Sequence, residues 1–237
     1  MTIVIPVRSG TKPIELKYAI RSLLKSFNEE VDICIIGDKI YSLRGLKYVS
    51  CQDERQNKYK ERNIYRKIIK AIDSPLVSDD FLVTNDDIYL TQPFDLKNLP
   101  FFHKGELENT MQKNAGDYRK SLNHTRKHLM IQGKATLDFD THFPIMYNKS
   151  KFIDTFAKAD LNWDQPFGYV IKSLYCNLNG IEGEFGADCK IHSKLTYEEI
   201  QKKIEGRTFF STSDGCMNDA MIRTLEKLYG EPSKYEK

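Results

Sequence analysis

Two carboxylates and an amide occur together directly after a short apolar run. Asn85, Asp86 and Asp87 follow the sequence Phe-Leu-Val-Thr and precede Ile-Tyr-Leu, and runs this short and β-rich are typical of buried strands. Ionised carboxylates are rarely placed there without a cation or firm hydrogen bonds. A divalent metal that holds a nucleotide diphosphate would require such hard oxygen ligands. A pair of turn or helix-capping aspartates explains this motif, taken alone, equally well.

A second group of residues with chemical potential lies in the segment 137–147. Apolar and polar residues alternate at its start, which predicts a half-buried strand with Asp138, Asp140 and His142 on one face. An acid beside an imidazole can transfer protons, so His142 and Asp140 are the candidate catalytic residues. A structural histidine paired with an aspartate is an equally good interpretation of this local pattern.

The segment 113–134 is basic. It is rich in Lys, Arg, His, Asn and Gln and has only a weak apolar helical face. It predicts either a solvated helix and loop or a cationic wall that faces phosphates or an anionic acceptor.

The elements that must position these residues alternate along the first ninety positions. Strands are expected at 2–7, 31–36, 46–50 and 81–83, and helices at 11–27 and 58–72. This order predicts an α/β fold with a mainly parallel, Rossmann-like sheet flanked by helices. In such sheets, ligands bind at the carboxyl ends of the strands, and the acidic motif follows one of them.

The rest of the chain predicts further helices and a glycine-rich connection. Helices are expected at 150–158 and 166–176, after the capping box of Thr196 and Glu199, and at 215–229. The glycines of 179–186 do not match a phosphate-binding fingerprint, so this stretch is expected to form loops or a hairpin. We expect a single domain over 1–237, with a nucleotide-binding half (1–100), an acceptor half (101–237) and a basic helical insertion.

Composition narrows the class of protein further. The 237 residues carry a formal net charge of +3, which suits an anionic partner such as a nucleotide without demanding nucleic acid. The five cysteines show no CxxC spacing, which indicates reduced thiols and argues against a zinc site. No stretch has the roughly 18 apolar residues that a membrane span needs, so a cytoplasmic location is expected.

Several segments, taken in order, resemble the Stealth family of sugar-phosphate transferases in capsular polysaccharide synthesis, within the broader glycosyltransferase-A fold. The matching segments are 18–23, 80–90, 101–105, 141–144 with 149–150, and 210–214 with 232–236. The opening segment 3–8 departs from Stealth and is closer to ordinary glycosyltransferases of this fold. Stealth members move a sugar 1-phosphate, whereas ordinary members move the sugar alone.

The resemblance implies roles for particular residues. The nucleotide-sugar donor would be contacted by Pro6, Val7, Arg8, Asp38, Asn63, Lys67 and Asp86. A divalent metal, Mn²⁺ or Mg²⁺, would be bound by Asp87 with Asn85 or Asp86, and by His192.

We therefore expect a metal-dependent glycosyltransferase that uses a nucleotide-sugar donor and a hydroxyl acceptor. The acceptor would be a saccharide or a modified nucleobase such as hydroxymethylated DNA. A Stealth-type sugar-1-phosphate transferase and a non-catalytic nucleotide- or glycan-binding module are the alternatives.

Overall fold

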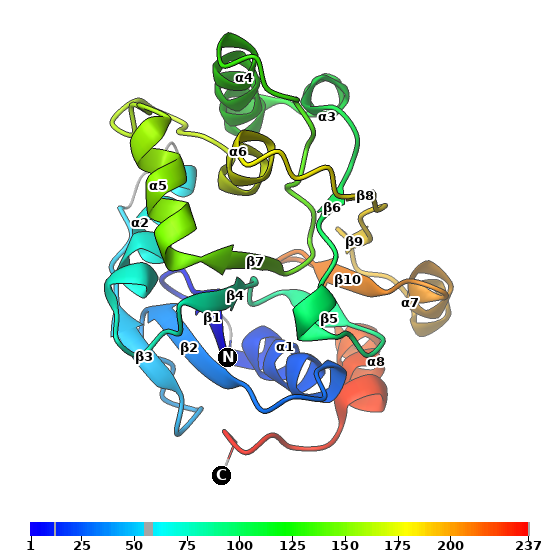
Figure 1. Ribbon diagram of the computed structural model, residues 1–237. Coiled ribbons are helices and arrows are strands. Elements are labelled where there is room, and N and C mark those ends of the chain that lie inside the picture. The colour runs from blue at the N-terminus through cyan, green and yellow to red at the C-terminus, as the bar shows by residue number, and fades with distance from the viewer. Residues whose placement is uncertain (12, 55–58, 237) are drawn as a thin grey trace.

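The computed structural model describes residues 1–11, 13–54 and 59–236, and its central sheet has five strands in the order β3-β2-β1-β4-β7. Strands β3, β2, β1 and β4 run parallel, and β7, at one edge, runs antiparallel to β4 (Figure 1). The strands are β1 (Thr2–Pro6), β2 (Asp32–Gly37), β3 (Lys47–Ser50), β4 (Asp80–Val83) and β7 (Ile145–Asn148). The prediction of a mainly parallel α/β sheet is confirmed.

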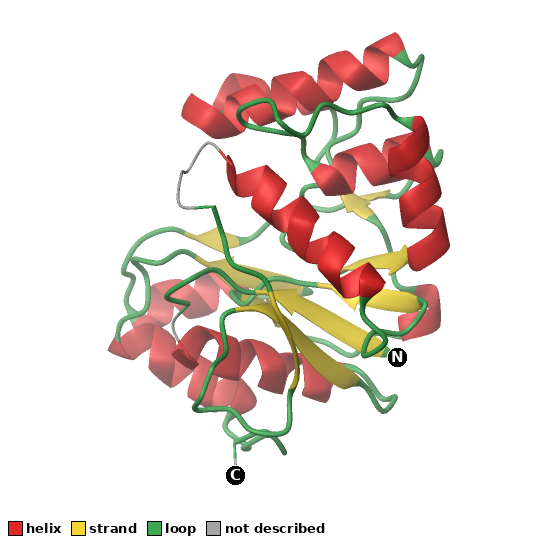
Figure 2. Ribbon diagram, turned by 90° about the vertical axis from the view of Figure 1, so that its left-hand side faces the viewer, coloured by secondary structure: helices red, strands yellow, loops and turns green. Residues whose placement is uncertain are grey.

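Each face of this sheet has its own apolar core, because successive residues of a strand point to opposite sides. Val4 packs on the side of the helices α2, α4, α5 and α6, whereas Ile3 and Ile5 pack against α1. All three side chains are fully buried. Figure 2 shows helices on both sides of the strands. These helices are α1 (Pro13–Ser26), α2 (Lys60–Asp73), α4 (Gly116–Ile131), α5 (Lys149–Lys158) and α6 (Ile171–Leu178).

A second, smaller sheet joins the middle of the chain to its C-terminal part. Its order is β5-β10-β9, with β10 antiparallel to β5 and parallel to β9. Tyr89, Phe210 and Ile191 from its strands pack with residues of the last two helices in a third core. The elements are β5 (Ile88–Leu90), β9 (Lys190–Ile191), β10 (Phe209–Thr212), α7 (Tyr197–Ile204) and α8 (Asp219–Tyr229).

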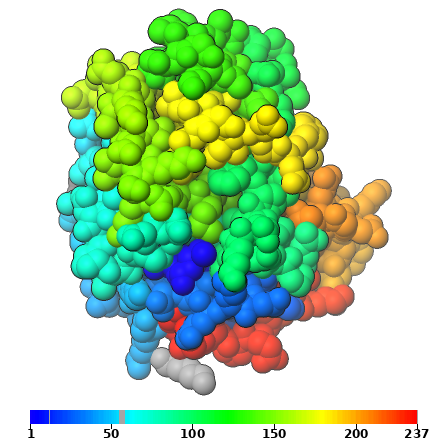
Figure 3. All heavy atoms as spheres, in the orientation of Figure 1, coloured from blue at the N-terminus to red at the C-terminus, as the bar shows by residue number. Residues whose placement is uncertain are grey.

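The predicted basic segment 113–134 forms mainly α4, and the remaining described elements are short. They are the 3₁₀ turn η2 (Leu96–Asn98), β6 (Phe102–His103), α3 (Leu107–Lys113) and β8 (Glu184–Phe185). In the space-filling view, α4 lies at one end of the molecule and the C-terminal residues lie at the other (Figure 3). The glycine-rich stretch does not form a hairpin, because β8 pairs in parallel with the distant β6.

Two expected helices begin later than their sequence patterns suggest. The helix expected at 166–176 begins at Ile171, because Phe167 and Gly168 have φ values of 74° and 54° that an α-helix does not accept. The last helix begins at Asp219, where the side chain of Asn218 caps it by accepting the N–H of Met221.

Other helix predictions are confirmed. Thr196 and Glu199 form the expected capping box of α7. The helix expected at 58–72 corresponds to α2, although residue 58 lies outside the described residues. Within the described ranges, no helix is both long and apolar enough to cross a membrane.

Candidate active site

The acidic motif lies at the carboxyl edge of the parallel strands. Thr84, the residue after β4, is buried and donates its backbone N–H to Val4 O on β1 (3.1 Å). Asn85 is exposed, whereas Asp86 and Asp87 are half-buried. Burial raises the pKa of Asp86, and the charge of Asp87 raises it further. The motif therefore follows a buried strand, as expected, and its two neighbouring carboxylates favour a nearby positive charge.

The second sheet brings a lysine to this motif. Asp87 precedes β5, and its backbone oxygen accepts the N–H of Thr212 at the end of β10 (3.1 Å). The pairing of β10 with β9 places Lys190 beside Ser211. Nζ of Lys190 then lies 3.5 Å from Oδ2 of Asp87, whereas Oδ1 of Asp87 is buried and has no hydrogen-bond partner. One carboxylate oxygen is thus paired with an ammonium group and the other is unsatisfied.

Lys190 also connects the acidic motif to His142. Its Nζ lies 3.1 Å from Nε2 of His142, and Nδ1 of the same ring lies 3.1 Å from Oδ2 of Asp188. The backbone N–H of His142 donates to the other oxygen of Asp188 (2.7 Å). In a neutral ring, Nδ1 therefore donates to Asp188, and Nε2 accepts from Lys190. A carboxylate that orients an imidazole in this way is typical of sites for proton transfer.

The ionisation of Asp188 reflects these contacts. Burial acts to raise the pKa of Asp188, but the hydrogen bond from His142 and the nearby positive charges lower it to about 2. The side chain of Asp188 is 17% exposed, so these interactions are only partly screened by solvent. Asp188 is consequently a stable anion beside the imidazole.

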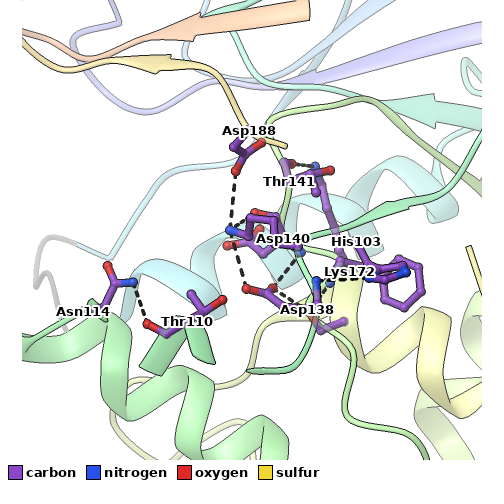
Figure 4. Close-up of polar contacts among 12 residues, drawn as sticks. His103, Thr110, Asn114, Asp138, Asp140, Thr141, Lys172 and Asp188 are labelled. Carbon is purple, nitrogen blue, oxygen red and sulfur yellow. Dashed lines mark hydrogen bonds and ion pairs between the residues drawn. The ribbon is translucent and has the colours of Figure 1, made fainter. Parts of the chain in front are cut away.

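A second lysine, Lys104, contacts three acidic residues, one of which is Asp188, the partner of His142. Figure 4 shows Asp138, Asp140 and Asp188 around a common centre. Nζ of Lys104 lies 3.5 Å from Oδ2 of Asp138 and 3.5 Å from Oδ2 of Asp188, and it donates to the backbone oxygen of Asp140 (2.7 Å). Burial acts to lower the pKa of Lys104, but the charges of Asp140 and Asp138 raise it overall. The buried Asp138 and its half-buried acidic neighbours are thus balanced by a half-buried ammonium group.

Asp140 is held in its ionised form by its surroundings. Its Oδ2 accepts a hydrogen bond from the hydroxyl of Tyr118, in the first turn of α4 (2.7 Å). Burial acts to raise the pKa of Asp140, but the charges of Lys104 and Lys172 lower it overall. A carboxylate with a lowered pKa is a weak proton acceptor, so His142 is better placed than Asp140 for the expected catalytic role.

The segment that carries these acids is not the expected strand, because side chains bind its backbone N–H groups. Oδ1 of Asp138 accepts the N–H of Asp140 (2.9 Å), and Oγ of Ser173 accepts that of Phe139 (3.0 Å). Oδ1 of Asn177 accepts the N–H of Leu137 (3.0 Å). With these groups bound by side chains, the chain is irregular up to β7, and the prediction that Asp138, Asp140 and His142 share a strand face is wrong. The three residues nevertheless belong to one polar network.

The loop that follows β1 is held by hydrogen bonds to the backbone of Val7. The backbone of Val7 donates to Ile36 O on β2 (2.9 Å) and accepts from Nζ of Lys67 (2.7 Å). Lys67 is buried and also pairs with Asp53 at 2.5 Å. Pro6, the last residue of β1, is half-buried. Lys67 therefore supports the predicted donor loop through its backbone.

The other predicted donor residues surround the same edge. Arg8 is exposed and pairs with Asp214 at 2.5 Å. Asp38 is half-buried and directly follows β2. The side chain of Asn63 donates to and accepts from the backbone of Glu54, each at 3.0 Å. The direct contacts of these residues with a nucleotide stay predictions.

The predicted metal ligands fit a metal ion only in part. Oδ1 of Asp87 is buried and has no hydrogen-bond partner, as is typical of an oxygen that could bind a metal. Asn85 and His192, by contrast, are exposed. Among the described residues, no three His, Cys, Asp or Glu side chains gather around a point that could hold a metal. The ammonium group of Lys190 beside Asp87 would also repel a divalent ion. Taken together, these residues therefore do not fit a divalent metal.

Some of the polar side chains of the basic helix α4 bind other parts of the molecule. Nδ1 of His124 lies 3.3 Å from Gly168 O, and Arg126 pairs with Glu108 at 3.0 Å. Arg119 and Lys127 are exposed. Both interpretations of this segment therefore keep part of their support.

A cavity of about 460 Å³ lies away from these residues, next to α5. Its lining includes Lys134, Lys151 and Lys158, but no residue of the acidic motif or of the network around Lys104. We do not assign the reaction to it.

Lys104, Asp188 and Lys190 belong to the site but were not expected from the sequence. Lys104 lies in the segment 101–105 that carries part of the family resemblance. Asp188 and Lys190 alternate with the buried Cys189 and Ile191, a period-2 pattern that places polar residues on one face. The family resemblance of 101–105 and this alternation are the sequence signals that indicate these three residues.

Solved structures share this architecture. A crystal structure of the galactosyltransferase LgtC in complex with donor and acceptor sugar analogues matches 99% of this chain and 97% of that chain, with a TM-score of 0.55 and 12% identity. A structure of an active-site mutant of LgtC matches with the same coverage, a TM-score of 0.53 and 12% identity. The glycosyltransferase GlyE of Streptococcus pneumoniae TIGR4 is less similar, with a TM-score of 0.43 and 9% identity over 96% of this chain and 59% of that chain.

No protein-family model and no curated protein matches the sequence significantly. At 12% identity, the likeness to LgtC establishes the fold alone. The chain is thus a single α/β domain with the fold of a known glycosyltransferase, and membership of the Stealth family is not shown.

Proposed function

We propose that this protein is a glycosyltransferase, which moves a sugar from a nucleotide-sugar donor to a hydroxyl group of an acceptor. The observation that best supports this activity is the continuous polar line from Asp87 through Lys190 and His142 to Asp188. It lies at the carboxyl edge of the parallel strands, where α/β folds bind their ligands, and the fold is one that a galactosyltransferase uses. The line combines a positive charge suited to a diphosphate with an oriented imidazole suited to proton transfer.

The donor would lie across the carboxyl ends of β1, β2 and β4. Its contacts would come from Pro6, Val7, Arg8, Asp38 and Asp86, and Asn63 and Lys67 would support the surrounding loops. Residues 1–100 would then form the nucleotide-binding half. Residues 101–237 would form the acceptor half, which supplies Lys104, His142, Asp188 and Lys190.

The proposed reaction forms one bond and breaks another. The acceptor oxygen bonds to the anomeric carbon of the sugar, and the bond from that carbon to the diphosphate oxygen breaks, so its electron pair leaves with the diphosphate. The acceptor proton passes to Nε2 of His142, which Asp188 orients through Nδ1. Lys190 stabilises the charge on the departing diphosphate. In the structure, Nζ of Lys190 donates to Nε2 of His142. A shift of Lys190 towards the diphosphate would free Nε2 to accept the proton.

The opening segment 3–8, which is closer to ordinary glycosyltransferases than to Stealth, favours sugar transfer over sugar-phosphate transfer. LgtC was crystallised with donor and acceptor sugar analogues, which also favours a saccharide acceptor over a modified nucleobase. The expected requirement for Mn²⁺ or Mg²⁺ is not part of this proposal, because Lys190 lies beside Asp87 and the other expected ligands are not assembled among the described residues. A non-catalytic binding module would bind the donor without releasing nucleotide.

Phosphorus NMR of reactions with a panel of nucleotide sugars and saccharides tests this proposal. We expect a nucleoside diphosphate together with a glycosylated acceptor. Hydroxymethylated DNA should be included as a second acceptor. A nucleoside monophosphate with a new phosphodiester on the acceptor would instead support sugar-phosphate transfer, and binding without turnover would support the binding module.

A further inference from the structure

The position of Lys190 is fixed by three strands rather than by a flexible loop. Lys190 is the first residue of β9 and pairs with Ser211 of β10, and Ser211 pairs in turn with Ile88 of β5. Asp87 directly precedes Ile88. The small sheet therefore holds the lysine and the aspartate next to each other across β10.

The side chain of Lys190 lies among groups that hold an ammonium ion well. Its Nζ is 3.5 Å from Oδ2 of Asp87 and 3.1 Å from Nε2 of His142. The side chains of Lys190 and Asp87 are 23% and 22% exposed, so solvent screens their attraction only in part. The carboxylates of Asp86 and Asp87 are adjacent in the chain, and a nearby cation reduces their mutual repulsion.

The same contacts leave little room for a divalent metal. The ring of His142 has both nitrogens engaged, one with Asp188 and one with Lys190. His192 is exposed, and no three-ligand group is present among the described residues. A metal at Asp87 would lie next to a positive charge already in place.

We infer that the ammonium group of Lys190 is the cation of the donor site, in the position where a divalent metal would otherwise bind Asp87. It would contact the diphosphate of the donor directly. The role in donor binding rests on the proposed function, whereas the occupation of the metal position by Lys190 does not.

The first part of the test measures metal binding alone, by Mn²⁺ titration followed by electron paramagnetic resonance. The proteins are the wild type, Lys190→Met, which keeps the stem and removes the charge, and Lys190→Met combined with Asp87→Asn. We expect Lys190→Met to bind Mn²⁺ about 10-fold more tightly than the wild type, because a carboxylate without its ammonium partner attracts a divalent ion. The double variant should lose this gain.

The second part measures the binding of UDP, GDP and ADP by calorimetry in the presence of EDTA. We expect the wild type to bind at least one of them, Lys190→Met to bind it about 10-fold more weakly and Lys190→Arg to retain most of the affinity. Lys202→Met, which removes an exposed charge from α7, is the matched control and should leave binding unchanged.

The two parts separate the possible failures. Mn²⁺ binding to the wild type that equals or exceeds binding to Lys190→Met would overturn the inference. So would nucleotide binding that needs Mn²⁺ and is unaffected by Lys190→Met. If no nucleotide binds the wild type with or without Mn²⁺, the proposed function fails, whereas the Mn²⁺ titration still decides whether Lys190 occupies the metal position.

Discussion

At the scale of single residues, the site depends on pairs that orient and charge one another. Asp188 holds the ring of His142 through two hydrogen bonds, one to Nδ1 and one to the backbone N–H. Lys190 joins that ring to Asp87. Each of these residues has a neighbour of complementary charge or hydrogen-bonding type, so a change at one position should affect the next.

The role of His142 in proton transfer predicts a large loss of turnover when the imidazole is removed. His142→Gln should lower the transfer rate by about 10²-fold, as expected for a lost general base. The melting temperature should change by only a few degrees, because the backbone hydrogen bond to Asp188 remains. His124→Gln, in α4, should retain its turnover. Equal turnover per folded molecule in both variants would show that His142 is purely structural.

The lowered pKa of Asp188 predicts how stability depends on pH. A carboxyl group whose pKa is lower in the folded than in the unfolded protein stabilises the fold above the unfolded pKa, and this contribution is lost as the pH falls through the folded pKa. With a folded pKa of about 2, compared with the ordinary 3.8, Asp188 should contribute about 2 kcal/mol that disappears between roughly pH 4 and pH 2.

Urea unfolding at several pH values measures this effect. The free energy of unfolding of Asp188→Asn should fall less steeply below pH 4 than that of the wild type. Asp154→Asn, at an exposed position on α5, should follow the wild-type curve. Parallel curves for Asp188→Asn and the wild type would contradict the prediction.

At the scale of elements, periodicity predicts the parallel strands and most helices because their apolar residues face a core. The segment 137–144 departs from its apparent strand pattern because Asp138, Ser173 and Asn177 bind its backbone N–H groups. Ser173 and Asn177 are distant in sequence, so local alternation carries no sign of them. Likewise, the left-handed backbone at Phe167 delays α6, and phenylalanine is not a residue type that indicates this conformation.

The junction between β1 and β2 predicts a sensitive glycine. Gly37 has φ of 143°, and a Cβ added there would lie 2.2 Å from the backbone oxygen of Val7. Gly37→Ala should therefore lower the free energy of unfolding by about 2–4 kcal/mol, because the donor loop must move. Gly206 also has a positive φ, of 67°, but no atom lies within 4 Å of an added Cβ, so Gly206→Ala should cost only about 1 kcal/mol. Equal losses in the two variants would show that backbone strain, and not the close approach to Val7, limits this position.

At the scale of the whole molecule, the fold could be predicted from the sequence and the site only in part. The acidic motif is visible because it directly follows an apolar strand. The site also contains Lys104, Asp188 and Lys190. These residues come close to the acidic motif only through the pairing of β5, β10 and β9 and through the long connections in the chain. The residues that join the two expected halves of the chain are therefore the ones that local patterns miss.

The most direct test of the central claim is phosphorus NMR of the donor reaction with the wild type and Asp87→Asn in parallel. If this edge of the sheet carries out glycosyl transfer, the wild type will release a nucleoside diphosphate. Asp87→Asn, folded and of similar melting temperature, should release it about 10²-fold more slowly. Equal rates in the two proteins would contradict the location of the site, and a nucleoside monophosphate as product would contradict the reaction.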